Sequence, residues 1–268
     1  MTTKPLPSRQ FAELAVHDLA DHITANSVLL QPLGAVEAHG PHLPLNTDLV
    51  IAEHAVNTIV QRVGDQFDLW ALPALGYTKS NEHAWAPGTV WLSATTMLAV
   101  LDDIGRSLAM TNARTLVFVN AHGGNSALLQ VALRDLRLKY GFKTFLVQPF
   151  TVSGEGNEFG MSIHGGHDET SMLMAIRPDL VDVGRAVRAV PEKLSENRHV
   201  RFGGSVSFGW LSDDFEAKPQ PGELPVGVIG DGTGASAEHG HLMWERVLTT
   251  MTEALAEISV WDSRSFQR

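Results

Sequence analysis

The sequence predicts an α/β layer fold with a mainly parallel sheet. Four short apolar runs, typical of buried strands, alternate with longer segments whose apolar residues recur at helical spacing. Strands that alternate with helices of this length favour parallel pairing, because each helix returns the chain to the same edge of the sheet. The pattern continues without an internal repeat, so we expect a single domain over residues 1–268.

Each element follows from the apolar pattern and from residues that start or stop it. Strands are expected at residues 28–33, 69–75, 115–119 and 142–147, and helices at 11–23, 48–63, 93–110, 126–140, 169–176 and 236–258. Ser93 is placed to cap one helix, Asp48 to cap another and Gly141 to end a third. Pro73 interrupts the second strand, and the helix before Pro178 stops there.

Composition argues against several functional classes. The 268-residue chain has 30 acidic and 20 basic residues, a net charge of -10 and no cluster of Lys or Arg, which argues against binding to nucleic acid or an anionic membrane. Because it has no cysteine, disulfides, thiolate metal ligands and a cysteine nucleophile are excluded. It has no apolar signal region near Met1 and no apolar run of roughly 20 residues to span a bilayer. We therefore expect a cytoplasmic protein.

The most informative segment directly follows the first strand. It holds Glu37, His39, His42 and Asp48 within a short stretch rich in glycine and proline. Enzymes of the α/β class place their sites where a strand ends in such a loop. Imidazole and carboxylate donors suit a divalent ion such as zinc, manganese or iron.

Two further clusters lie at similar transitions. His122 follows the third strand, and His164, His167 and Glu169 precede or open a later helix. Because the carboxyl ends of parallel strands share one edge, we expect all three clusters to converge. Taken singly, Asp48 could be only a helix cap, His122 a buried core residue, and His164 and His167 surface residues. Their matching placement favours a metal or catalytic site.

The three clusters resemble, in the same order, the motifs of the creatininase family of amidohydrolases. The matching positions are Glu37, His39, Gly40, Pro41, His42, Leu43, Pro44, Thr47 and Asp48; Asn120, His122, Gly123, Gly124 and Asn125; and His164, Gly166, Glu169, Thr170 and Ser171. Glu82-His83 with Pro87-Gly88-Thr89, and residues 227–238, also resemble that family. The resemblance covers residues 28–258 and implies a three-layer α/β/α fold around a mainly parallel central sheet.

The resemblance also implies two divalent metal ions per chain, with zinc preferred and manganese or iron as alternatives. The implied metal ligands are Glu37, His39, Asp48, His122 and Glu169. Asp48 would be the bridging carboxylate, since two neighbouring cations need a shared anion. Two such cations lower the pKa of a bridging water to about 7, which gives hydroxide at neutral pH. His164 and Glu169 are the implied catalytic residues, and His164 would donate a proton to the leaving nitrogen.

The implied reaction is hydrolysis of a non-peptide C–N bond by the metal-activated hydroxide, in a small cyclic (lactam-like) amide or a formamide. Two alternatives keep the same dinuclear site: C–C hydrolysis of a cyclic polyketone sugar, and processing of a modified peptide precursor. A non-catalytic metal-binding or assembly protein is a third interpretation, which the availability of His164 beyond the five ligands disfavours. The resemblance also implies a small-molecule substrate and a homo-oligomer, with a hexamer as one option.

At one position this chain differs from creatininase itself, a member of the family that it resembles. Creatininase carries a ligating glutamate where this chain has Gly124. The missing carboxylate makes Glu169 the expected replacement and argues against creatinine as substrate. His42 is expected either to orient a ligand or to be structural, and His167 to face solvent.

Three tryptophans lie in or beside the loops that flank the expected site. Trp85, Trp91 and Trp210 could form an aromatic wall for a flat substrate or pack ordinarily, and packing is favoured for Trp91. Asn125 is expected to cap a helix or orient substrate. The proline- and glycine-rich residues 212–233 are expected to form a lid.

Overall fold

The centre of the molecule is a four-stranded sheet in the order β2-β1-β3-β4. The computed structural model describes residues 8–153, 162–202, 204–215 and 226–262. The strands are β1 (Val28–Leu33), β2 (Leu69–Ala71), β3 (Thr115–Asn120) and β4 (Lys143–Val147). Every neighbouring pair is parallel, which confirms the predicted sheet.

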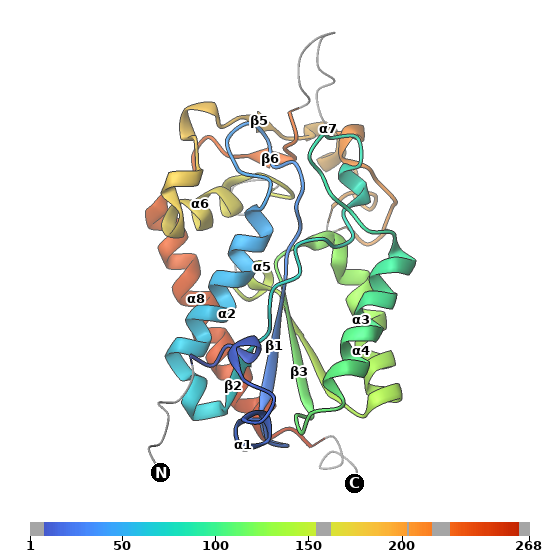
Figure 1. Ribbon diagram of the computed structural model, residues 1–268. Helices are drawn as coiled ribbons and strands as arrows, with labels where there is room; N and C mark the ends of the chain where they lie inside the picture. The colour runs from blue at the N-terminus through green and yellow to red at the C-terminus, as the bar shows by residue number, and fades with distance from the viewer. Residues whose placement is uncertain (1–7, 154–161, 203, 216–225, 263–268) are drawn as a thin grey trace.

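Helices cover both faces of this sheet, which makes the fold three-layered (Figure 1). The five long helices are α2 (Thr47–Phe67), α6 (His167–Ile176) and α8 (Ala237–Ser259) on one side, and α3 (Ala94–Leu108) and α4 (Ser126–Tyr140) on the other. Successive side chains of a strand point to opposite faces. Val28 and Leu30 accordingly lie in the core beneath α2 and α8, whereas Leu29 and Leu33 lie in the core beneath α3 and α4. A strand that is buried on both faces has a continuous apolar sequence, and this pattern predicted the strands of the sheet.

The predicted helix ends are confirmed at two positions. The Ser93 hydroxyl accepts a hydrogen bond from the Thr96 amide, as a helix cap does. Gly141 ends α4 with a φ of 74°, a conformation that glycine adopts without strain. The predicted cap at Asp48 is wrong, because α2 begins at Thr47 and Asp48 lies inside its first turn.

The predicted helix over residues 11–23 is also wrong. The segment forms a 3-10 turn at Phe11–Glu13 and the short helix α1 (Leu19–His22), separated by extended backbone at Leu14. No residue of either piece is fully buried, but Phe11, Leu14 and Leu19 pack at the edge of the core beneath α3 and α4, and Ile23 is buried in it, so the apolar residues make their contacts without a continuous helix. The second strand ends at Ala71 rather than at residue 75, two residues before Pro73.

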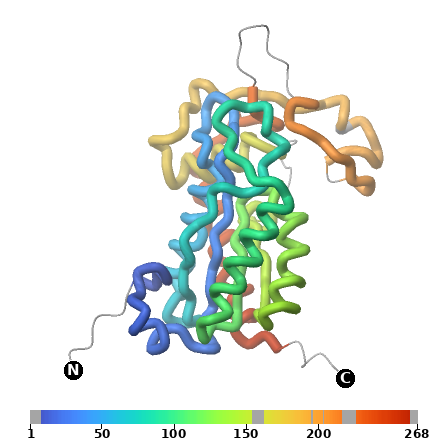
Figure 2. Tube along the Cα trace, turned by 45° about the vertical axis from the view of Figure 1, so that its right-hand side comes forward, coloured from blue at the N-terminus to red at the C-terminus, as the bar shows by residue number. Residues whose placement is uncertain are grey.

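Shorter elements cover the carboxyl edge of the sheet, and Figure 2 shows several of them as the yellow and orange segments at the top. They are α5 (Pro149–Val152), β5 (Arg188–Ala189) paired antiparallel with β6 (Gly230–Asp231), α7 (Glu192–Ser195), and 3-10 helices at Asn81–His83, Gly123–Asn125, Pro178–Leu180, Val183–Arg185 and Ser212–Asp214. Within the described ranges no helix combines the length and apolar character that a membrane crossing requires.

Candidate active site

In the structure the three clusters converge at the carboxyl edge of the sheet, as expected from the sequence. Glu37 and His39 follow β1, and His122 follows β3. Asp48 lies in the first turn of α2, and Glu169 lies in the first turn of α6. The structure therefore brings all five predicted metal ligands into one buried site.

Asp48 lies between two imidazoles. Its Oδ1 is 3.0 Å from Nε2 of His39, and its Oδ2 is 3.0 Å from Nδ1 of His122. Each carboxylate oxygen thus faces a different histidine. A single short carboxylate in this position can serve two neighbouring cations.

Both histidines are oriented through their other ring nitrogen. Nδ1 of His39 lies 3.1 Å from the Glu37 carbonyl oxygen, and Nε2 of His122 lies 2.8 Å from the Lys79 carbonyl oxygen. Because a carbonyl oxygen only accepts, these hydrogen bonds place a proton on the outer nitrogen of each ring. The inner nitrogen then directs a lone pair at the carboxylates, which is how a metal-ligating histidine is held.

Glu37 and Glu169 complete two groups of donors. Oε1 of Glu37 lies 3.3 Å from Nδ1 of His122, and Oε2 of Glu169 lies 3.9 Å from Nε2 of His39. The Ser80 hydroxyl donates to Oε2 of Glu37, and the Gly165 amide donates to Oε2 of Glu169 at 2.5 Å. These contacts fix both carboxylates in the site.

The carboxylates are poorly satisfied without a cation. Oε1 of Glu37 and Oδ2 of Asp48 are buried, and neither accepts a hydrogen bond from the described part of the chain. Buried carboxylate oxygens normally have partners, so such atoms indicate a missing positive charge. The donor set therefore fits divalent cations held by nitrogen and oxygen ligands.

The pKa shifts of the site residues also indicate a place for a cation. Burial by itself would lower the pKa of His39, but the carboxylates of Asp48, Glu169 and Glu37 outweigh it and raise the pKa to about 10. Burial and the neighbouring Asp48 carboxylate raise the pKa of Glu169 to about 7, against the opposing effect of His39. The pocket carries a strong negative field that a bound cation would neutralise.

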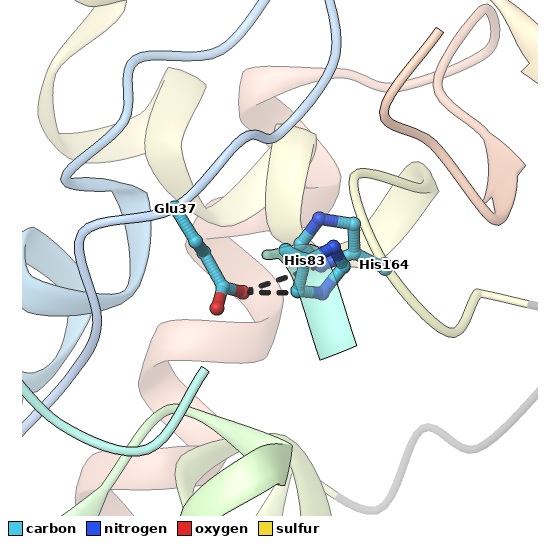
Figure 3. A group of neighbouring side chains, drawn as sticks. All are labelled: Glu37, His83 and His164. Atoms are coloured by element: carbon cyan, nitrogen blue, oxygen red, sulfur yellow. Dashed lines mark ion pairs between the residues drawn. The ribbon is translucent and has the colours of Figure 1, made fainter. Parts of the chain in front are cut away.

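His83 is a site residue that the sequence did not assign. Burial lowers the pKa of both His83 and His164, and the two rings stack with centroids 4.0 Å apart. Nε2 of His83 and Nδ1 of His164 lie 3.7 and 3.6 Å from Oε1 of Glu37. Dashed lines in Figure 3 mark these two contacts. The signal was present, since the pair Glu82-His83 belongs to a loop that carries the family resemblance, but the strand before that loop ends at Ala71, well before Glu82, whereas Glu37 and His122 closely follow their strands.

A family model described as Creatininase, creatinine amidohydrolase, matches residues 12–255. The chain belongs to the creatininase family. As a member of this family it is a hydrolase of the amidohydrolase type.

Named relatives of two kinds match this creatininase-family chain. It is 34% identical over 233 residues to a mycofactocin precursor peptide peptidase of Mycolicibacterium smegmatis, covering 86% of this chain and 83% of the relative. It is 30% identical over 251 residues to a creatinine amidohydrolase of Pseudomonas putida, covering 86% and 89%. A structure described as "Creatininase Mn" superposes with a TM-score of 0.70 at 27% identity, over 93% of this chain and 98% of that one. Together with the His and carboxylate groups, these similarities suggest divalent metal binding.

The glycine that departs from creatininase is closed in by its neighbours. A Cβ atom on Gly124 would lie 1.9 Å from Oε1 of Glu82, 2.4 Å from Nε2 of His122 and 2.8 Å from the Lys79 carbonyl oxygen. The Glu82 carboxylate thus fills the space that a side chain at position 124 would enter. The replacement of the missing ligand by Glu169 stays a prediction. Glu82 is a second acidic residue that lies close enough to Gly124 to take the role of that ligand.

Two loop histidines have structural partners. Nε2 of His42 lies 3.0 Å from Oγ1 of Thr170, so His42 ties the first motif to α6 rather than to a predicted ligand. His167 is only 7% exposed and its Nε2 contacts the Gly234 carbonyl oxygen, so the expectation that it faces solvent is wrong. It was misplaced because its burial depends on the start of α8, far away in the sequence.

Asn125 connects three loops instead of capping α4. Its Oδ1 accepts from the Lys79 amide at 3.1 Å, and its Nδ2 donates to the Gly34 carbonyl oxygen at 3.3 Å and to Oδ1 of Asn120 at 3.1 Å. No side-chain cap bond forms at the start of α4. The predicted cap is wrong, and the side chain instead joins the loops after β1, β2 and β3.

A cavity of about 370 Å³ opens onto the site, within the range typical of small-molecule pockets. Its lining includes the predicted ligands Glu37, His122 and Glu169, together with Lys79, Glu82, His83, His164, Phe208 and Trp210. Nζ of Lys79 lies 2.7 Å from Oε2 of Glu82, so the lining combines a charged pair with the aromatic side chains of Phe208 and Trp210.

The three flanking tryptophans differ in role. Trp210 lines the cavity, as an aromatic wall would. Nε1 of Trp85 donates to Oγ of Ser212 at 2.6 Å, which holds the two loops together. Trp91 is 44% exposed. The part of the expected lid at residues 216–225 lies outside the described residues.

Proposed function

We propose that this chain is a metal-dependent amidohydrolase with a dinuclear site. The observation that carries the proposal is the position of Asp48, whose two oxygens face His39 and His122. One ion would be held by Glu37, Asp48 and His122, and the other by His39, Asp48 and Glu169. Zinc is the first candidate and manganese or iron the alternatives, because imidazole and carboxylate donors accept all three.

When bound, such ions polarise a carbonyl and supply a nucleophilic hydroxide at neutral pH. His164 is proposed to move the proton. Its Nε2 lies 2.5 Å from the Ala38 carbonyl oxygen, which keeps that nitrogen protonated, while Nδ1 faces Oε1 of Glu37. Nδ1 is therefore the atom that would take a proton in the cavity and return it to the leaving nitrogen. The stacked ring of His83 fixes the plane of His164 during this transfer.

Two classes of amide substrate agree with this site. The first is a small cyclic amide or formamide, in line with the creatinine amidohydrolase relative. The second is a modified peptide precursor, in line with the mycofactocin precursor peptide peptidase relatives. The peptide is favoured by a cavity lining that holds both the Lys79–Glu82 charged pair and aromatic side chains, since a peptide offers charged and apolar groups to contact both. C–C hydrolysis of a cyclic polyketone gains no support from these named relatives.

The experiment is a substrate panel on enzyme freed of metal and reloaded separately with zinc, manganese or iron. Creatinine, lactams, formamides, short peptides and cyclic polyketones would be tested, with products identified by mass. We expect release of an amine only from metal-loaded enzyme, and loss of the active-site metal and of turnover in Asp48→Asn. Equal turnover by metal-free and metal-loaded enzyme would refute the proposal. Release of a carboxylate without an amine would replace amide hydrolysis by C–C hydrolysis.

A further inference from the structure

A second cluster of metal-binding side chains lies outside the active site, where the start of α6 meets the start of α8. His167 and Asp168 are the first two residues of α6, and His239 lies in the first turn of α8. None of the three lines the active-site cavity. The cluster is thus separate from the proposed catalytic ions, although α6 also carries Glu169 to the active site.

The three side chains approach one common point. Oδ1 of Asp168 lies 3.4 Å from Nδ1 of His167 and 3.9 Å from Nε2 of His239, and one donor atom from each residue lies within 4.8 Å of the others. Two ligands about 2.1 Å from a tetrahedral metal ion are roughly 3.4 Å apart. The donor atoms therefore need only small side-chain movements to share an ion.

The orientation of His167 matches that of a metal ligand. Its Nε2 lies 3.1 Å from the Gly234 carbonyl oxygen, which places the ring proton there. Nδ1 lies 3.4 Å from Oδ1 of Asp168, and in the tautomer that carries its proton on Nε2 both of these atoms are acceptors, a pair that a cation between them would stabilise. His39 and His122 are held in the active site by the same kind of bond to a backbone carbonyl.

The surroundings allow an ion to enter and be retained. The side chains of Asp168 and His239 are 14% and 17% exposed, so water can reach the cluster and fill the remaining coordination positions. A cation at a helix N-terminus meets the unfavourable end of the helix dipole, and the Asp168 carboxylate in that first turn opposes this effect. Two imidazoles with one carboxylate favour zinc, cobalt or iron over calcium and magnesium.

Helices α6 and α8 are in close contact beside the cluster. A Cβ atom on Gly240 would lie 1.9 Å from the Ser171 carbonyl oxygen, so α6 and α8 are in close backbone contact one residue after His239. A site built on two closely packed helices keeps its ligands in place better than one built on loops.

We propose that His167, Asp168 and His239 bind one divalent transition-metal ion, separate from the active-site ions, that joins α6 to α8. The ion would hold the helix that presents Glu169.

The test counts bound zinc by equilibrium dialysis on the full chain. Wild type, His239→Gln and Asp168→Asn are compared, with His241→Gln as the matched control, because His241 is an exposed histidine on the same helix. We expect His239→Gln and Asp168→Asn to bind one zinc fewer per chain, or to bind it at least tenfold more weakly, and His241→Gln to equal wild type. An unchanged zinc count and affinity in His239→Gln would overturn the proposal.

A second measurement separates this site from the catalytic one. Asp48→Asn, which removes the proposed shared ligand of the active site, should still bind one zinc or cobalt ion. That remaining ion should be lost in the double variant Asp48→Asn/His239→Gln. If Asp48→Asn binds no metal, or if its remaining ion survives His239→Gln, the proposed site does not exist, whatever the outcome for catalysis.

Discussion

Replacing Gly124 by alanine adds one methyl group at a tightly packed point of the active site. The new Cβ atom would lie 1.9 Å from Oε1 of Glu82, 2.4 Å from Nε2 of His122 and 2.8 Å from the Lys79 carbonyl oxygen. Heavy atoms in ordinary contact are about 3.5 to 4.0 Å apart, so all three contacts must open. The carboxylate is the end of a flexible side chain and can move. The imidazole ring and the backbone carbonyl cannot move without disturbing the site.

The size of the expected loss follows from the contacts that a shift of His122 would break. Shifting the His122 ring lengthens its 2.8 Å contact with the Lys79 carbonyl oxygen and moves Nδ1 away from Asp48. Loss of such an orienting bond typically costs 10- to 100-fold in metal affinity or activity, or about 1.4 to 2.8 kcal/mol. We expect Gly124→Ala to lose kcat/KM and zinc affinity together, by a factor in this range.

The assay measures zinc affinity and turnover of the substrate that the panel identifies. Gly123→Ala is the matched control, because a Cβ atom there meets nothing within 4 Å. The double variant Gly124→Ala/Glu82→Ala should stay impaired, since the clash with His122 remains. Wild-type zinc affinity in Gly124→Ala would refute the reasoning, and full recovery in the double variant would show that Glu82, not His122, transmits the effect.

Three further predictions address other parts of the molecule. His164→Asn should lower kcat by about 10² to 10⁴-fold while the number of bound metal ions stays at the wild-type value, because a proton carrier is removed but no proposed ligand is; loss of metal would instead make His164 a ligand. Trp210→Ala should raise KM more than it lowers kcat, because the indole lines the cavity and lies outside the group of metal-binding side chains; an unchanged KM would exclude substrate contact. Gly240→Ala should lower the free energy of unfolding by about 1 to 3 kcal/mol in denaturant titrations, because its Cβ atom would lie 1.9 Å from the Ser171 carbonyl oxygen. Alanine is favoured over glycine in a helix by about 1 kcal/mol, so a stabilised variant would contradict the close packing of α6 and α8.

Local patterns determined the sheet and the place of the site. Short apolar runs such as Val28–Leu33, too short for a buried helix, are typical of strands covered on both faces, and helical segments between them favour parallel order. Once the strands are parallel, residues that follow their carboxyl ends share one edge. For this reason Glu37, His39 and His122 could be grouped correctly without knowing any contact between them.

Local patterns failed where long-range packing decides. Residues 11–23 have helical spacing, but their apolar side chains reach the core through a 3-10 turn and one short helix joined by extended backbone, so no continuous helix forms. Asp48 has the side chain of a cap, yet the chain enters α2 one residue earlier, and the carboxylate turns to the histidines instead.

The sequence by itself determined the family, the parallel α/β architecture and which chemical groups gather at the carboxyl edge, because those follow from periodicity and from motifs short enough to read directly. Only the tertiary structure placed His83 against His164 and Glu82 in the space beside Gly124. It alone also buried His167 beside His239. These contacts join loops and helices that lie far apart in the chain, and no local pattern specifies the distance between such residues.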